Sequence, residues 1–189
     1  MLITKLFIAV GIVWPVSEIL MGLFKRARGA SAVVKDRGSL AVRWGAIGLG
    51  IYAGFRVRFG GVGSMGVPLA VFESVGLVLL LCGLALRWTA VITLGRLFTA
   101  NVAVHEGQRV VRTGVYRHVR HPAYSGLLLA FVGLGVGFGN WLSVVLIFAP
   151  IALALSYRIK VEEAALLEGL GAEYADYCKV TKRLIPGIY

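Results

Sequence analysis

The chain has 189 residues, of which 58% are hydrophobic and 15% are charged, and its formal net charge is +11. Soluble domains carry roughly 25% charged residues, so this composition argues against a soluble globule. Nucleic acid binding would require the positive charge to form a stripe on one soluble face. The basic residues instead collect in alternate connections between apolar blocks, so nucleic acid is not an expected partner.

The charge-poor blocks along the chain predict an all-α integral membrane protein with about five membrane segments. A span needs ~20 apolar residues to cross ~30 Å of hydrocarbon. We interpret the first three blocks as full spans and the last two as a short helical hairpin joined by a Gly-Asn turn. The blocks cover residues 2–24, 40–55, 68–86, 126–139 and 140–156.

The first block has an alternative interpretation as a secretory signal peptide, because Ala30, Ser31 and Ala32 resemble a small-residue cleavage site. However, a basic cluster separates the apolar block from that site, where a cleavable signal carries no charge. An uncleaved span is therefore expected. The cluster consists of Lys25, Arg26 and Arg28.

The charges of the connections predict the orientation of the protein. The positive-inside rule places connections rich in Lys and Arg in the cytoplasm. The first and third connections and the tail are rich in them, whereas the second has only Arg56 and Arg58. We therefore expect the N-terminus outside and the C-terminus in the cytoplasm, in the plasma membrane of a prokaryote. The surplus charge also favours contact with anionic membrane lipids.

Two glycine-rich stretches differ in meaning. Gly61, Gly63 and Gly66 have the spacing of a dinucleotide-binding loop, but no strand precedes them, and the expected location is extracellular. A flexible turn is the favoured interpretation. The later glycines at 133, 135, 137 and 139 are paired four residues apart, which allows another helix to approach closely.

Neither a disulfide nor a metal site is expected. Cys82 lies inside an apolar block, Cys178 lies in the tail, and neither has neighbours at metal-ligand spacing. A metal site built from His118, His121 and a glutamate is disfavoured, because a membrane di-iron enzyme would need more than the three histidines of this chain.

The stretch RHVRHPAY, residues 117–124, stands directly before an apolar block and ends a polar segment that is too polar to span. The segment should therefore lie at the cytoplasmic interface, with turns at Glu106-Gly107 and Thr113-Gly114. Pro122 suits the first turn of a helix, which places His121 at the helix mouth. Within this stretch, Arg117 can reach lipid phosphates and His118 is expected on the solvated side.

A second polar stretch follows the last apolar block and contains Arg158, Glu162 and Glu163. Its apolar and acidic residues alternate as in an amphipathic helix that stops near residues 169–171. A short hairpin separates the two polar stretches, so they return to the same side of the membrane and can meet. Of the adjacent glutamates, we favour Glu163 as the inward one. A pocket of mixed charge at this boundary would suit a zwitterionic cofactor.

These motifs together resemble the isoprenylcysteine carboxyl methyltransferase family and its phospholipid methyltransferase relatives. The resemblance covers residues 94–189, whereas residues 1–93 of the same single membrane domain remain unassigned in specificity. The matching motifs are Gly114-x-Tyr116, then Arg120-His121-Pro122-x-Tyr124, then Glu162-Glu163 ahead of Gly171 and Tyr174.

The resemblance implies S-adenosylmethionine as the methyl donor, held in a cytoplasmic pocket, and a lipophilic small-molecule acceptor that enters from the bilayer. Arg120 and Glu163 are the expected catalytic residues. The residues expected to hold the donor are Val111, Gly114, Tyr116, His121, Pro122, Tyr124, Arg158 and Glu162.

Methyl transfer from a sulfonium mainly requires alignment of donor and acceptor and exclusion of water. Arg120 could orient a carboxylate acceptor, whereas an amine acceptor would require a base such as Glu163 or His121. The alternatives are a phospholipid N-methyltransferase and a non-catalytic adaptor that binds anionic lipid. The tail also resembles sterol reductases that use NADPH, but these carry asparagine in place of Pro122.

Overall fold

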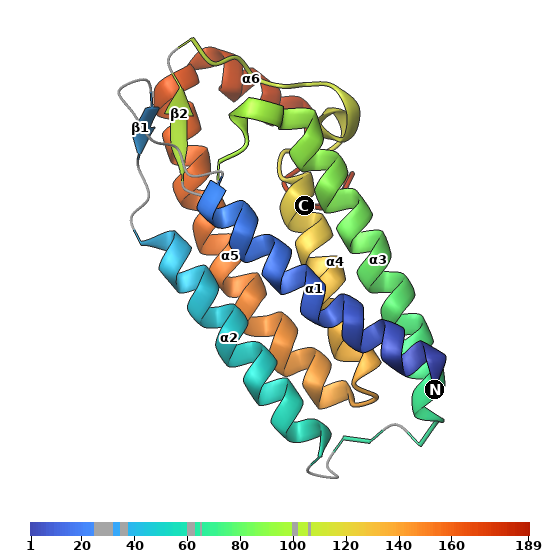
Figure 1. Ribbon diagram of the computed structural model, residues 1–189. Helices are drawn as coiled ribbons and strands as arrows, with labels where there is room; N and C mark the ends of the chain where they lie inside the picture. Colours follow the sequence, from blue (N-terminus) through green and yellow to red (C-terminus); the bar gives the residue numbers. More distant parts are fainter. Residues whose placement is uncertain (25–31, 35–37, 60–62, 65, 100–101, 106) are drawn as a thin grey trace.

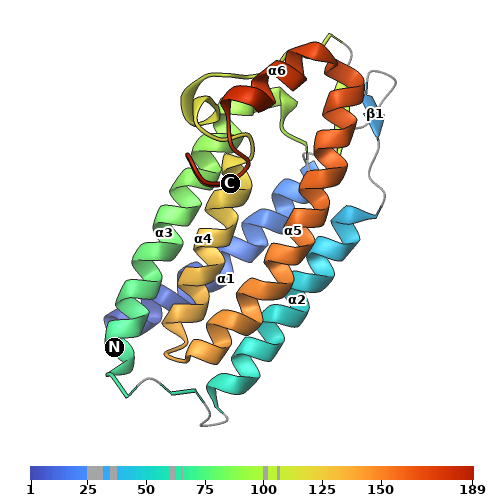
Figure 2. The same cartoon turned by 180° about the vertical axis from the view of Figure 1, so that it is seen from behind.

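The computed structural model describes residues 1–24, 32–34, 38–59, 63–64, 66–99, 102–105 and 107–189 (Figure 1). Four long helices lie side by side in one layer, in the order α3, α4, α5, α2, and α1 crosses one face of this layer obliquely (Figures 1 and 2). The bounds are α1 (Leu2–Phe24), α2 (Ser39–Arg58), α3 (Leu69–Leu94), α4 (Pro122–Gly137) and α5 (Trp141–Leu170). A shorter helix, α6 (Ala172–Val180), lies across one end.

By length and composition, three helices are able to cross a membrane: α1, α3 with its extension to Leu97, and α5. The apolar helix α4 is shorter, and α2, which carries Arg43, Arg56 and Arg58, is not among the three. The sequence predicted full spans over residues 2–24, 40–55 and 68–86. The first of these coincides with α1. The prediction treated residues 140–156 as the second arm of a short hairpin, but the helix that contains them, α5, extends to Leu170 and is long enough to span.

Two predicted boundaries were wrong for identifiable reasons. The third block was expected to end before Arg87, but α3 continues to Leu94 because Arg87 pairs with Glu18 of α1 inside the bundle. The fifth block and the amphipathic segment after it form one helix of 30 residues, which Pro150 does not interrupt. This helix ends where predicted, at Gly171, whose φ of 53° favours glycine.

The structure is not purely helical, because two three-residue strands pair antiparallel. Strand β1 (Ala32–Val34) joins β2 (Ala103–His105), with Val33 opposite Val104. The pair joins the α1–α2 connection to the α3–α4 connection at the end of the bundle that carries α6. Two 3₁₀ turns, Gly95–Leu97 and Gly114–Arg117, complete the third connection.

The opposite end of the bundle gathers the N-terminus and the other two connections (Figure 1). Thr4 donates to Glu73 at the start of α3 over 2.6 Å, and Ser64 bridges to Asn140 between α4 and α5. The α4–α5 turn forms at Gly139 and Asn140 as predicted, and the Asn140 side chain accepts from the amide of Leu142 at 2.9 Å. The predicted basic residues Lys25, Arg26, Arg28, Lys35 and Arg37, together with Ala30, Ser31, Gly61 and Glu106, lie outside the described residues.

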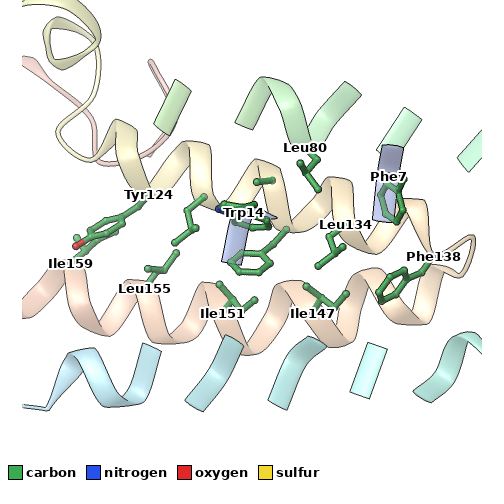
Figure 3. Close-up of a cluster of buried hydrophobic side chains, with 13 residues drawn as sticks. Phe7, Trp14, Leu80, Tyr124, Leu134, Phe138, Ile147, Ile151, Leu155 and Ile159 are labelled. Atoms are coloured by element: carbon green, nitrogen blue, oxygen red, sulfur yellow. The ribbon is translucent and has the colours of Figure 1, made fainter. Parts of the chain in front are cut away.

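A row of buried apolar side chains runs between α4 and α5 and under α1 (Figure 3). Trp14 of α1 packs against Phe131 of α4 with ring centroids 4.7 Å apart. Ile147 and Ile151 of α5 are fully buried in the same cluster. This packing fixes α1 across the layer.

Glycines allow α3 and α4 to pack with their backbones in contact. A Cβ atom on Gly76 would lie 2.6 Å from the carbonyl oxygen of Gly133, and one on Gly83 would lie 2.6 Å from that of Gly126. Both pairs are spaced seven residues apart on their helices. The predicted close approach at Gly133 is confirmed, and the four-residue pairing with Gly137 continues it.

We expect Gly83→Ala to destabilise the bundle by about 1–3 kcal/mol, because the added methyl group must separate two backbones. Gly48 is the matched control, since a Cβ there meets nothing within 4 Å. Gly48→Ala should be neutral or slightly stabilising through helix propensity. Thermal unfolding of the two variants in detergent measures the difference, and equal midpoints would contradict this account of the packing.

Candidate active site

The start of α4 is fixed by the C-terminal tail. The amides of Arg120 and His121 donate to the carbonyls of Lys182 and Arg183 over 2.8 and 2.9 Å. Pro122 occupies the first turn of α4, as predicted, so His121 lies at the helix mouth. The imidazole stacks on Tyr124 with ring centroids 5.6 Å apart. These contacts orient the side chains of the motif toward one place.

A cavity of about 900 Å³, counting its open mouth, lies at this end of the bundle. Of the predicted site residues, the structure brings seven to its wall, and they come from the third connection, α4 and α5: Val111, Tyr116, Arg120, His121, Tyr124, Arg158 and Glu162. Tyr174 of the resembling motif, together with Tyr177, also lines the wall.

Gly114 and Pro122 shape the backbone without lining the cavity. Gly114 has φ of 58° and forms the predicted turn at Thr113-Gly114. Tyr116, two residues later, is buried against α3, where its hydroxyl donates to the Ala90 carbonyl at 3.4 Å. The role predicted for Gly114 is therefore one of local conformation.

Tyr124 connects a cation and an anion on the cavity wall. Its hydroxyl donates to Glu162 over 2.6 Å and accepts from the Nε of Arg158 over 2.8 Å. Arg158 also donates to the hydroxyl of Ser39 in α2 over 3.0 Å. The cavity wall thus carries a positive and a negative group, and the hydroxyl of Tyr124 bonds to both of them.

Glu163 lies in a different environment from Glu162. Its carboxylate accepts from the Nε of Arg120 and the Nε of Arg183, each over 2.9 Å, and the His121 Nε2 lies 3.4 Å away. Glu163 is the more buried of the pair, but Glu162 is the one that lines the cavity. The prediction that Glu163 is the inward glutamate agrees with its burial, whereas Glu162 takes the place on the cavity wall because adjacent residues of a helix diverge by ~100°.

The tail contributes Arg183 and two carbonyl groups to the site, which the charge pattern of the sequence did not predict. Arg183 closes the Glu163 cluster, and the hydrogen bond that its guanidinium donates to this carboxylate raises the pKa of Arg183. Arg120 also donates to the carbonyls of Cys178, over 3.2 Å, and Thr181. The signal that could have pointed to Arg183 is the need of a buried carboxylate such as Glu163 for more than one counter-charge.

Tyr177 fastens α6 to the third connection. Its hydroxyl donates to the carbonyls of Tyr116 and Val119 over 2.5 and 3.3 Å. Burial raises the pKa of Tyr177 to about 12, so the hydroxyl stays protonated and able to donate at neutral pH. Arg117 and His118 are both exposed, in agreement with their expected separation from the site.

Among the described residues, no group of three or more His, Cys, Asp or Glu side chains is placed to hold a metal ion. Cys82 is an exposed thiol and Cys178 a partly buried one, and burial raises the pKa of Cys178.

The fold and the cavity define a class of protein: a helical membrane bundle with a polar pocket of mixed charge at one end. Residues 75–168 match the isoprenylcysteine carboxyl methyltransferase (ICMT) family. This match agrees with the family resemblance of the motifs, and the protein is an integral membrane protein.

Several known proteins are similar to the chain. A probable protein-S-isoprenylcysteine O-methyltransferase of Oryza sativa subsp. japonica is 38% identical over 116 residues, which cover 60% of this chain and 61% of the relative. Protein-S-isoprenylcysteine O-methyltransferase B of Arabidopsis thaliana is 34% identical over 116 residues, which cover 60% of this chain and 59% of the relative.

The solved structure of the eukaryotic intramembrane Ras methyltransferase ICMT matches with a TM-score of 0.59 and 25% identity. The match covers 77% of this chain and 53% of that chain. The chain spans about three fifths of the length of the curated plant relatives. These relatives are eukaryotic, so they give no support to the expected prokaryotic plasma membrane.

Proposed function

We propose that the chain is an integral membrane methyltransferase that uses S-adenosylmethionine and methylates a lipophilic acceptor. The observation that supports this most directly is the presence of Arg120, Arg158 and Glu162 on the wall of one cavity. Apolar and aromatic side chains, among them Leu94, Phe98 and Tyr174, complete the wall of the same cavity.

The donor set fits a zwitterion with an aromatic group. The guanidinium of Arg158 and the imidazole of His121 suit a carboxylate, and the carboxylate of Glu162 suits an ammonium. The rings of Tyr116 and Tyr174 and apolar groups such as Val111 suit a purine and exclude water. S-adenosylmethionine, when bound, supplies a methyl group that is already activated by its sulfonium.

The chain's own residues then need to align the acceptor and exclude water, and no covalent nucleophile is required. Arg120 reaches the cavity wall while Glu163 holds its Nε, so it can orient a carboxylate acceptor. Glu163 is a poor candidate for a base, because Arg120 and Arg183 bind its carboxylate and stabilise the charge that uptake of a proton would remove. This environment favours O-methylation of a carboxylate over N-methylation of an amine.

The names of the relatives suggest an isoprenylcysteine carboxylate as the acceptor. We propose that the acceptor has this chemistry, or that it is a lipid-linked small molecule of the same kind. An acceptor with an apolar tail can reach the cavity from the bilayer, because residues of the apolar helices α3 and α5 line it.

The decisive experiment is calorimetry of S-adenosylmethionine and S-adenosylhomocysteine with the detergent-purified protein. Saturable binding of both would support the methyltransferase, whereas absence of binding would favour the lipid-binding adaptor. Membranes incubated with methyl-labelled donor should then transfer the label to the organic phase. Label confined to soluble protein would contradict a lipophilic acceptor.

We further propose that all five long helices cross the membrane and that the end with the cavity is cytoplasmic. The pairing of β1 with β2 and the bridge of Val119 to Lys182 support this, since they gather the basic connections at one end. The N-terminus and Ser64 lie at the other end.

Cysteine labelling from outside intact cells tests this orientation, with Cys82 and Cys178 replaced by serine. A cysteine at the exposed position of Ser64 should react, and one at the exposed position of Thr113 should react only after permeabilisation. The reverse pattern would place the cavity outside the cell and contradict the proposed orientation.

A further inference from the structure

A second cavity lies inside the bundle, between α1 and α2. Its volume is about 330 Å³ including open space, and α4 forms its floor with Leu127 and Phe131. Trp14 lines it from α1 and Ile47 from α2. Seven of its nine lining residues are apolar or aromatic, so the opening offers a hydrocarbon chain an apolar surface to lie against.

Two ionisable groups, Glu18 and Arg43, also reach this wall. Glu18 is neutralised, because Arg87 donates to both of its carboxylate oxygens from Nε and Nη2, and the Trp14 indole N–H also donates to it over 3.3 Å. The indole and the acid are therefore satisfied within the protein. Arg43 is the wall residue that remains to be explained.

Arg43 is 6% exposed, and its Nε is buried without a hydrogen-bond partner among the described residues. Its guanidinium lies 5.3 Å from the ring centroid of Trp44, which orients the group but gives it no counter-charge. A buried cation inside a membrane bundle is costly and is usually paired. The unpartnered donor therefore indicates a missing anion.

The surrounding charges strengthen this conclusion. Arg158 and Arg87 both repel the charge of Arg43, and Glu18, the acid within electrostatic reach of it, is already engaged by Arg87. Tyr124, which lines the first cavity, is also within electrostatic reach of Arg43. Arg43 thus stands between an apolar cavity and the proposed reaction site, in a region with surplus positive charge.

We infer that the α1–α2 cavity binds a single-chain amphiphile, with its anionic group on Arg43 and its hydrocarbon tail against Trp14, Ile47 and Leu127. The anionic group is a carboxylate or a phosphate monoester. The inference rests on the proposed function. It adds a site within the membrane that binds the lipophilic ligand before the ligand moves to the donor.

Tryptophan quenching tests this directly, because Trp14 and Trp44 both line the cavity. Trp88 and Trp141, which are partly exposed, are replaced by phenylalanine, and the protein is placed in phosphatidylcholine nanodiscs. The probes are dibromostearic acid, at about pH 9 so that it is ionised, and the dibrominated alcohol of the same length. A third probe carries the same chain as a phosphate monoester.

We expect saturable quenching by the carboxylate, with an affinity at least roughly tenfold higher than for the alcohol, as one charge-assisted contact would give. Arg43→Gln should lower the carboxylate affinity to that of the alcohol. Arg56→Gln on the same helix is the matched control, because Arg56 is exposed and carries the same charge. The ratio of phosphate to carboxylate affinity identifies which headgroup the site prefers.

Equal affinities of the acid and the alcohol for unaltered protein would overturn the inference, as would an Arg43→Gln variant that keeps the preference. If Arg43→Gln fails to fold, Arg43→Lys should keep the preference for the acid. Ile47→Phe should weaken binding of both chains by narrowing the cavity, and it adds no further tryptophan to the assay. Donor calorimetry on the same samples separates the two proposals. If the donor still binds but the acid quenches no better than the alcohol, only the proposal of the α1–α2 site is wrong and the proposed methyltransferase function stands.

Discussion

Glu163→Gln is expected to destabilise the protein by about 3 kcal/mol, which would lower the unfolding midpoint by several degrees. The carboxylate is the shared counter-charge of Arg120 and Arg183, and Arg120 has a side chain that is only 9% exposed. A neutral amide leaves that guanidinium buried with carbonyl partners alone. Thermal unfolding in detergent measures the loss.

Glu162→Gln is the matched control, since it removes the same charge one residue away. Glu162 is half-buried and its carboxylate accepts from the neutral hydroxyl of Tyr124, so its replacement should change stability little. It should instead weaken donor binding roughly tenfold or more, because a carboxylate on the cavity wall is lost. If both variants unfold alike, the separation of a structural and a binding glutamate is wrong.

Arg120→Ala should reduce methyl transfer more than a hundredfold, whereas Arg117→Ala should stay near the unaltered rate. Arg120 contacts the cavity, Glu163 and two carbonyls of the tail, and each charge-assisted contact contributes ~1.5–3 kcal/mol. Arg117 is exposed and can lose its charge without leaving a partner unpaired. Label transfer to lipid at fixed protein concentration gives the comparison.

Arg120→Lys distinguishes loss of the charge from loss of the guanidinium, because lysine keeps the positive charge but lacks the planar group that can bind a carboxylate through two nitrogens. This variant should fold and bind donor but lose most of the transfer rate, if Arg120 orients the acceptor. Parallel variants His121→Ala and His118→Ala extend the comparison, since only His121 lines the cavity. Equal losses at all four positions would make the stretch an interfacial lipid anchor.

The helices were predictable from the sequence where apolar blocks have clear ends. The span of α1 and the turn at Gly139-Asn140 agree with the structure, because charge and turn residues mark these ends. The length of α3 was not predictable, since Arg87 is tolerated only through a partner 69 residues away. Pairing of β1 with β2 was missed for the same reason, as its two short segments gain stability only from each other.

The site shows the same division between local and distant information. Positions near Pro122 were placed correctly because proline sets the helix start. The roles of Glu162 and Glu163 depend on the rotation of α5 against α4, which local patterns do not specify. Arg183 was passed over because its partner Glu163 lies on α5, 20 residues earlier in the chain. Arg43 was passed over because no local pattern shows what an arginine inside an apolar block contacts.

The ion pair of Glu18 and Arg87 has a consequence for how the protein enters the membrane. During synthesis, α1 emerges with an acid that has no counter-charge until α3 has been made. A lone ionised side chain at the centre of a span raises the insertion free energy by about 2.5–3.5 kcal/mol, and less near its ends. The first helix should therefore insert inefficiently on its own at the translocon, and it should become stable in the bilayer only once the third helix has inserted beside it.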